Sequence, residues 1–164
     1  MKNLTLLVAA TLLVGIGHFA FVLHAGHAED AAKTGQDQQQ KKQDQLLIAV
    51  QRICPMSGKK LGVMGDPVKT KIGEEELFLC CEKCRNGKVN KDHLAAIHVN
   101  MAKAQGRCPV MNKAISENGP STIVAGRTVY VCCAACKRKV QADPKVYLEK
   151  VDALYAASIN VEKK

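Results

Sequence analysis

The stretch VYVCCAAC, residues 129–136, contains three apolar residues, two adjacent cysteines and a third cysteine three positions later. LFLCCEKC, residues 77–84, has the same form. Upstream of these stretches, Cys54-Pro-Met56 is matched by Cys108-Pro-Val110. The eight cysteines of the chain therefore divide into two sets of four. Such self-similarity is the sequence signature of an internal repeat, which decides the architecture.

The spacing of the cysteines agrees between the two copies. In both of them, three residues separate the strand-end cysteine from the last cysteine. Between Cys54 and Cys80 there are 25 residues, and between Cys108 and Cys132 there are 23. Chance seldom produces this agreement, so we interpret the copies as two versions of one small unit.

Each copy predicts a β-hairpin followed by a helix. In the first copy, residues 67–72 alternate between apolar and polar side chains, a glycine interrupts the pattern, and residues 76–79 continue as a strand. In the second copy, residues 121–124 and 128–131 form the strands, and residues 125–127 form the turn. A helix is expected after the last cysteine of each copy.

A second helix is expected near the end of the chain. Asp143 supplies a cap residue and Pro144 suits the first helical position. One face of this helix carries apolar residues with helical spacing, which we expect in the core: Tyr147, Val151, Leu154 and Tyr155. The first copy lacks this proline, which favours one continuous helix from about residue 82 to residue 104.

The N-terminal part indicates export. Residues 1–28 combine a short positive start with an almost wholly apolar run, typical of a signal peptide or a membrane anchor. Residues 29–46 are polar and read as a flexible or loosely helical, disordered spacer. The first and second modules then occupy residues 47–105 and 106–164. We therefore expect a protein of the periplasm or cell envelope, attached to the membrane if the N-terminal segment is retained.

The net charge of +9 favours anionic partners. Nucleic acid is excluded as a partner by the predicted export, and the aromatic content of 4% leaves few side chains on which bases could stack.

A unit of about 50 residues seldom folds by apolar burial alone and needs a metal, a disulfide or a partner. Thiols before a hairpin, at its end and on the following helical turn meet at one corner, as in a treble-clef zinc site. Thiolates suit zinc and copper(I). The expected fold is therefore α+β, with two small tandem treble-clef-like ββα modules after the N-terminal apolar helix and the spacer.

The pattern resembles the YHS and TRASH families of small metal-binding modules. It consists of Cys-Pro, a hairpin, a Cys-x3-Cys pair and then DPKVYL, residues 143–148. The resemblance covers residues 54–98 and, more fully, 108–151. It implies a treble-clef-like fold and a role in heavy-metal sensing, trafficking or resistance. Carried over, the family's ligands fall on six positions: Cys54, Cys80, Cys84, Cys108, Cys132 and Cys136.

The chain departs from the family at the fourth ligand. Where such modules often have a second cysteine in the first turn, this chain has Ser57 and Met111. Where the family often has a small residue after the strand-end cysteine, this chain has Cys81 and Cys133. These two thiols are candidate fourth ligands, although adjacent side chains of an extended segment point apart. Water, or Met111 in the second copy, is the alternative.

Other interpretations of the cysteines remain. Eight cysteines in an exported protein are compatible with disulfides. Two Cys-x-x-Cys pairs at helix starts, residues 81–84 and 133–136, are compatible with a thiol-disulfide redox protein. The modules can also be an interaction scaffold stabilised by metal or disulfides. His93 and His98 are expected to be ordinary helix-surface residues.

The sequence shows no catalytic constellation, so we do not expect an enzyme. The function that it favours is binding of zinc or copper(I) for sequestration, trafficking or resistance. The expected partners are the metal ion and a membrane-bound metal transporter or another envelope protein.

Overall fold

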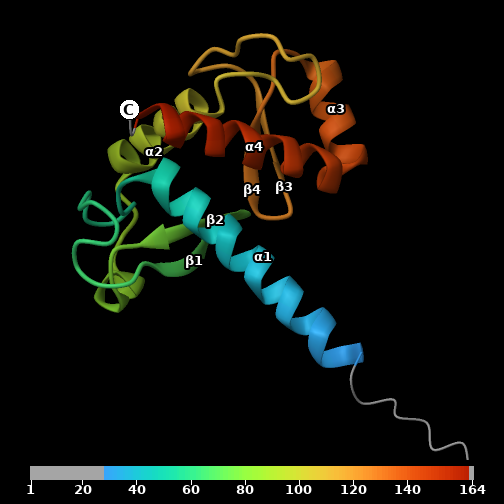
Figure 1. Ribbon diagram of the computed structural model, residues 1–164. Helices are drawn as coiled ribbons and strands as arrows, with labels where there is room; N and C mark the ends of the chain where they lie inside the picture. Colours follow the sequence, from blue (N-terminus) through green and yellow to red (C-terminus); the bar gives the residue numbers. More distant parts are fainter. Residues whose placement is uncertain (1–27, 163–164) are drawn as a thin grey trace, which may run out of the picture.

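The computed structural model describes residues 28–162, and the side chains of residues 37–161. Its elements, shown in Figure 1, are α1 (Ala28–Gln51), β1 (Val68–Ile72), β2 (Glu75–Leu79), the 3₁₀ helix η1 (Glu82–Asn86), α2 (Lys91–Gln105), β3 (Ser121–Val124), β4 (Arg127–Tyr130), α3 (Ala134–Ala142) and α4 (Pro144–Glu162). Helices thus occur together with two small antiparallel sheets. The predicted α+β class is confirmed.

The predicted signal peptide or anchor, residues 1–28, lies almost wholly outside the described residues. Within residues 28–162, no helix combines the length and the apolar character needed to cross a bilayer.

Both predicted hairpins are present. β1 pairs with β2 so that Val68 lies opposite Leu79, and β3 pairs with β4 so that Ser121 lies opposite Tyr130. The second hairpin turns at Ala125 and Gly126, which have φ values of 48° and 75°. Two consecutive left-handed residues are the geometry that matches the twist of a two-residue hairpin. The last strand of each hairpin therefore leads into a pair of adjacent cysteines.

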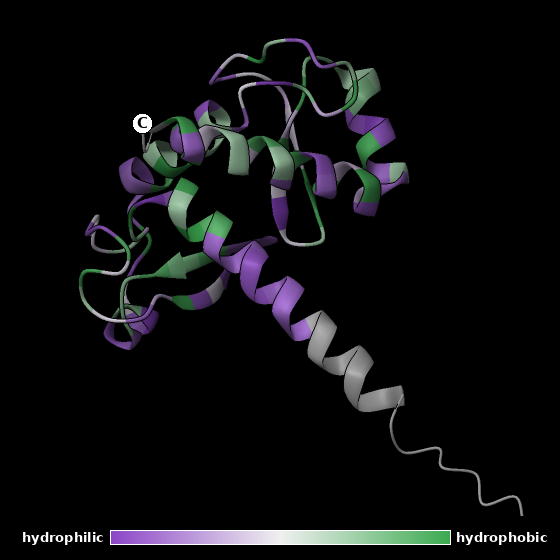
Figure 2. Ribbon diagram, in the orientation of Figure 1, coloured by the Kyte–Doolittle hydropathy of each residue, from purple (hydrophilic) through white to green (hydrophobic). Residues whose placement is uncertain are grey.

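The segment that was expected to be a disordered spacer differs from the prediction. Residues 37–46 belong to α1, and that helix continues to Gln51. Figure 2 shows its hydrophilic part giving way to a hydrophobic end, where Leu47 and Val50 are buried. The helix forms here because its apolar end packs against the rest of the protein, which most of a helix's stability requires.

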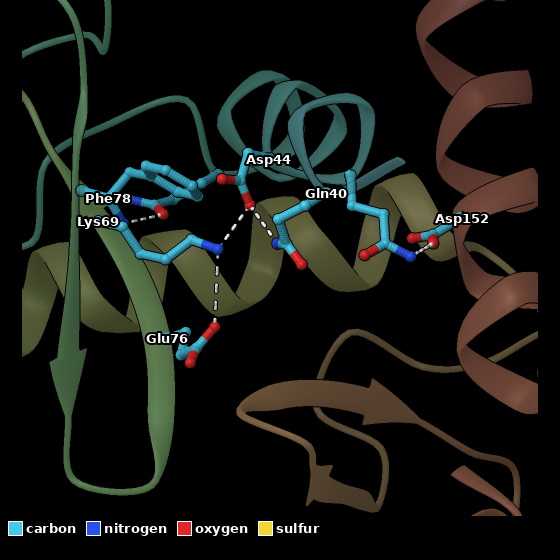
Figure 3. A network of polar contacts seen from close by, with 8 residues as sticks. Gln40, Asp44, Lys69, Glu76, Phe78 and Asp152 are labelled. Atoms are coloured by element: carbon cyan, nitrogen blue, oxygen red, sulfur yellow. Dashed lines mark hydrogen bonds and ion pairs between the residues drawn. The ribbon is translucent and has the colours of Figure 1, made fainter. Parts of the chain in front are cut away.

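Polar contacts also attach α1 to both halves of the chain. Lys69 of β1 reaches Asp44 at 2.6 Å and Glu76 at 3.8 Å, and its ammonium lies 5.6 Å from the centre of the Phe78 ring (Figure 3). Gln43 donates to Asp152 of α4 at 3.2 Å. Gln43 and Asp44 of α1 are therefore held by contacts with both copies.

The continuous helix predicted for residues 82–104 is wrong. η1 ends at Asn86, and α2 begins at Lys91 with Asn90 as its cap. The Asn90 side chain accepts hydrogen bonds from the backbone N–H groups of Asp92 and His93 at 2.8 and 3.2 Å. Local capping competes with helix continuation here. In the second copy, α4 begins at Pro144 as predicted.

The two copies share one hydrophobic core. Helices α1, α2 and α4, which come from both copies, pack against one another. The largest fully buried apolar side chains come from both copies: Val50, Leu77, Leu79, Ile97, Met101, Val129, Val131, Val140, Val151 and Tyr155. Of the predicted α4 face, Val151 and Tyr155 are buried, whereas Tyr147 and Leu154 are partly buried.

The hairpins also contact each other directly. The backbone N–H of Glu76 donates to the carbonyl of Gly126 at 2.7 Å. Next to this bond, the buried carboxylate of Glu75 accepts from the Thr128 hydroxyl and lies 2.8 Å from His98 Nε2. The equivalent strand position of the second copy carries Arg127, which pairs with Asp152 of α4. The repeat thus keeps a strand-to-helix ion pair in both copies and reverses its charges.

Candidate metal centres

A buried glutamine precedes the first cysteine of each centre. In the first copy, the Gln51 amide donates to the carbonyl oxygens of Phe78 and Ile53 and accepts from the Phe78 N–H, at 2.7 to 2.9 Å. In the second copy, Gln105 makes the same three bonds with Tyr130 and Arg107, at 2.6 to 3.0 Å. Each amide thus joins the last turn of a helix to the strand that ends at the cysteines.

The sequence reasoning missed these two glutamines. The signal was present, because a glutamine lies three residues before the Cys-Pro pair in both copies. Its meaning depends on burial, and both side chains are 1% exposed.

A tight turn follows each glutamine and presents the first thiol. The Cys54 N–H donates to the Lys59 carbonyl, and the Gly58 N–H returns to the Cys54 carbonyl, at 2.8 and 2.9 Å. The Cys108 turn repeats both bonds at 2.8 Å, with Lys113 and Asn112 as partners. Gly58 and Asn112 are both left-handed, with φ values of 68° and 54°. Glycine and asparagine are the residues that adopt this conformation most readily.

Each copy brings three thiols together. The sulfur atoms within each group lie within 4.8 Å of one another; the groups are Cys54, Cys80 and Cys84, and Cys108, Cys132 and Cys136. These are the six positions that the family resemblance implied. One thiol comes from the turn, one from the strand end and one from the helical turn that follows. Each group could hold a metal ion.

The distances between the sulfur atoms suit a tetrahedral ion. With a zinc–sulfur bond of about 2.3 Å, the edge of a tetrahedron of sulfur atoms is about 3.8 Å. The Cys80 and Cys84 sulfurs lie 3.6 Å apart, and those of Cys132 and Cys136 lie 3.7 Å apart. Little movement is therefore required for both thiols to bind one ion.

The remaining cysteines lie beside these groups. Cys81 Sγ is 4.0 Å from Cys80 Sγ and 3.9 Å from Cys84 Sγ, and its side chain is partly buried. Cys133 Sγ is 3.5 Å from Cys136 Sγ, and its side chain is exposed. Neither belongs to the group of thiols that all lie within 4.8 Å of one another, and the assignment of each as a fourth ligand stays a prediction.

The turn residues contribute differently in the two copies. Ser57 Oγ lies 3.3 Å from Cys80 Sγ, so a hydroxyl borders the first centre. Met111 is 52% exposed, and its proposed ligation of the second centre also stays a prediction.

In each centre, the pKa of the first thiol is lowered. Burial opposes ionisation of Cys54, but hydrogen bonds from the Ser57 hydroxyl and from the N–H groups of Ser57, Cys80 and Met56 lower its pKa to about 6. Burial also opposes ionisation of Cys108, and the N–H groups of Cys132, Met111 and Val110 lower its pKa. Each turn therefore stabilises a thiolate, the form that binds metal.

In each centre, the pKa of the thiol on the helical turn is raised. Burial and hydrogen bonding to Cys80 and Cys54 raise the pKa of Cys84 to about 12. Burial and the neighbouring thiols Cys133, Cys132 and Cys108 raise the pKa of Cys136 to about 12 as well. Each centre without metal thus retains protons that a cation must displace.

The two histidines take specific positions. His98 is paired with the buried Glu75 and is only partly exposed. The His93 ring packs against Gly58, where an added Cβ would lie 2.6 Å from Nε2. Both are more constrained than the predicted helix-surface residues.

Comparisons of the chain with protein-family models, with curated proteins and with solved structures found no match. The resemblance to the YHS and TRASH modules therefore rests on the motifs alone.

Proposed function

We propose that this protein binds zinc or copper(I) at two cysteine centres outside the cytoplasm, for metal sequestration, trafficking or resistance. One observation carries the proposal: two groups of three thiols, each with sulfur atoms within 4.8 Å of one another, occur at equivalent places in the repeat. Soft thiolate ligands favour these two metals over calcium or magnesium.

The electrostatics of the centres support this function. Each centre offers one thiolate of lowered pKa, at Cys54 or Cys108, toward which a cation is attracted. The raised pKa values of Cys84 and Cys136 limit the negative charge until the ion arrives. The extracytoplasmic location rests on the apolar N-terminal segment of the sequence. A membrane-bound metal transporter or another envelope protein is the partner that fits.

Metal analysis of the full chain, purified under reducing conditions, tests the proposal. We expect two ions per chain, one for each cysteine group. Cys54→Ser and Cys108→Ser should each remove one of them. If Met111 is the fourth ligand, Met111→Leu should weaken binding at the second centre, whereas Met64→Leu is the control, since both methionines are about half exposed. A reduced wild-type protein that takes up neither metal would refute the function.

A second function is favoured by the Cys133–Cys136 pair. Hydrogen bonds from the backbone and the thiol of Cys136 lower the pKa of the exposed Cys133 thiol, and Cys136 is buried and 3.5 Å away. An exposed thiolate beside a buried thiol is the arrangement of thiol-disulfide exchange proteins. Cys133 would attack a substrate disulfide, and Cys136 would then displace the second thiol as the internal disulfide forms.

Reduction of a small disulfide by the metal-free protein distinguishes the two functions. The redox function predicts that the reduced, metal-free protein reduces about one equivalent of the disulfide as the Cys133–Cys136 disulfide forms, and that Cys133→Ser abolishes this reaction. The metal function predicts that bound zinc protects both thiols from alkylation.

A further inference from the structure

The two centres differ in what covers their turns. In the first copy, the chain that leaves η1 passes directly over the Cys54 turn. The N–H of Asn90 donates to the carbonyl of Pro55 at 3.0 Å. Gly87 lies so close that an added Cβ would be 3.4 Å from Cβ of Met56. Residues 87–90 therefore form a short strap across the first centre.

Helix α2 strengthens this cover. Its first turn places the His93 ring on Gly58, the residue that closes the Cys54 turn. His93 Nδ1 is buried. The strap and the start of α2 thus cover the Cys54 side of the first centre.

The second centre lacks an equivalent strap in the described structure. Here the cysteines lead into α3, a helix of nine residues, and the chain turns back only at Asp143. Helix α4 then passes the Cys108 turn and leaves a cavity of about 400 Å³ that opens to solvent. Its lining comes from the turn and from α4: Cys108, Pro109, Val110, Asn112, Lys150, Ala153 and Leu154. A larger cavity of about 790 Å³ lies between α1 and the start of α4, where no cysteine lines it.

The two remaining cysteines, Cys81 in the first copy and Cys133 in the second, also differ in exposure. Cys81 is partly buried and lies within 4.0 Å of two other thiols of its centre. Cys133 is exposed. The cavity borders the Cys108 turn, but Cys108 itself is 1% exposed, so a soft ligand from another molecule can approach the second centre at Cys133.

We propose that the two centres have different tasks: the first retains its ion as part of the fold, and the second exchanges its ion with a thiol-bearing acceptor. This inference rests on the proposed metal-binding function. Both centres use the same kind of ligand, so access decides which ion leaves.

The exchange is a ligand substitution without a change of oxidation state. An acceptor thiol loses its proton to solvent and forms a metal–sulfur bond in the second centre. With Cys133 as the predicted fourth ligand, the bond between the ion and Cys133 breaks, and the Cys133 thiolate takes up a proton. Repetition of this substitution at the remaining thiols moves the ion to the acceptor.

Zinc transfer from the zinc-loaded full chain to a coloured chelator tests the inference, with glutathione as the acceptor thiol. We expect a fast phase that glutathione accelerates and a slow phase that it does not. Cys108→Ser should remove the fast phase and keep the slow one. Because Cys133 is the ligand that the acceptor displaces first, Cys133→Ser should speed release from the second centre and make it less dependent on glutathione. Cys81→Ser, the matched variant of the first centre, should leave that phase unchanged.

The outcomes separate this inference from the function on which it rests. If the wild-type chain takes up no zinc, the metal-binding function itself fails. If it binds two ions and releases both at one rate, or if Cys54→Ser removes the fast phase, only the division of tasks is overturned. Since Cys108→Ser can disturb the fold, retention of the slow phase and of the circular dichroism spectrum reports that the first centre is intact.

Discussion

Gln51 and Gln105 show how single residues hold the candidate centres. Each is buried and makes three hydrogen bonds with backbone groups, two of them with the residue two positions before the strand-end cysteine. A backbone polar group left buried without a partner costs about 1–3 kcal/mol. The glutamines therefore position the thiols although they touch no metal.

Gln105→Ala should lower the free energy of unfolding by about 2–4 kcal/mol, because it leaves the Tyr130 backbone groups unpaired and opens a cavity. Denaturant unfolding of the metal-loaded protein measures this. Gln40→Ala is the control, since Gln40 is exposed and bonds only to Asp44 within the described residues. A loss of unfolding free energy no larger than that of the control would show that the amide does not support the strand.

His98 gives the protein a pH-dependent contact. Its hydrogen bond with Glu75 raises its pKa above the ordinary value, against the opposing effect of burial. A pKa that is raised on folding contributes stability that is fully present below the unfolded value, about 6.5, and that is lost as the pH rises through the folded value. His98→Gln should therefore destabilise the protein more at about pH 5.5 than at about pH 9.

Urea unfolding of both proteins at the two pH values checks this expectation. His93→Gln serves as the comparison, because His93 makes no ion pair with an acidic residue in the described part of the chain. An equal loss of stability for His98→Gln at both pH values would contradict the contribution of the pair.

At the scale of elements, the break between η1 and α2 is the main departure from the predicted secondary structure. Asn90 ends the strap and caps α2, so the loss of helical residues at 87–90 is linked to the cover of the first centre. The second copy places its break after α3 instead, because Asp143 and Pro144 start the next helix there. The two cysteine centres therefore have different neighbours because the second helix of each copy begins at a different place.

Asn90→Ala should lower the free energy of unfolding by about 1 kcal/mol, because the first turn of α2 loses the oxygen that accepts two backbone N–H groups. Amide hydrogen exchange should quicken at Asp92 and His93. Asn118→Ala, in an exposed loop, is the control and should change little. Unchanged exchange in α2 would show that the side chain is not needed as a cap.

At the scale of the whole molecule, the repeats are not independent. They share a core, and bonds of Glu75 and Glu76 to residues of β4 and its turn join the hairpins. Polar contacts of α1 reach both β1 and α4. A substitution that destabilises one copy should therefore also destabilise the other.

Leu77→Ala in the first copy should cost about 2–5 kcal/mol and should also speed amide exchange in β3 and β4. The reason is that Leu77 is 1% exposed within the shared core. Ile123→Ala is the control, since Ile123 is 39% exposed. Two separate unfolding transitions, with only the first shifted by Leu77→Ala, would contradict a shared core.

The sequence by itself determined the repeat, both hairpins, the start of α4 and the cysteines that meet in each group. These features depend on local signals, namely strand alternation, turn residues, a cap followed by proline, and the same spacing twice. Tertiary structure decided the rest: α1 joins the fold where a spacer was expected, Gln51 and Gln105 become buried, and residues 87–90 cover one centre while a cavity borders the other. Burial depends on which distant segments pack together, and one repeat pattern packed against different neighbours places a strap over one cysteine turn and a cavity beside the other.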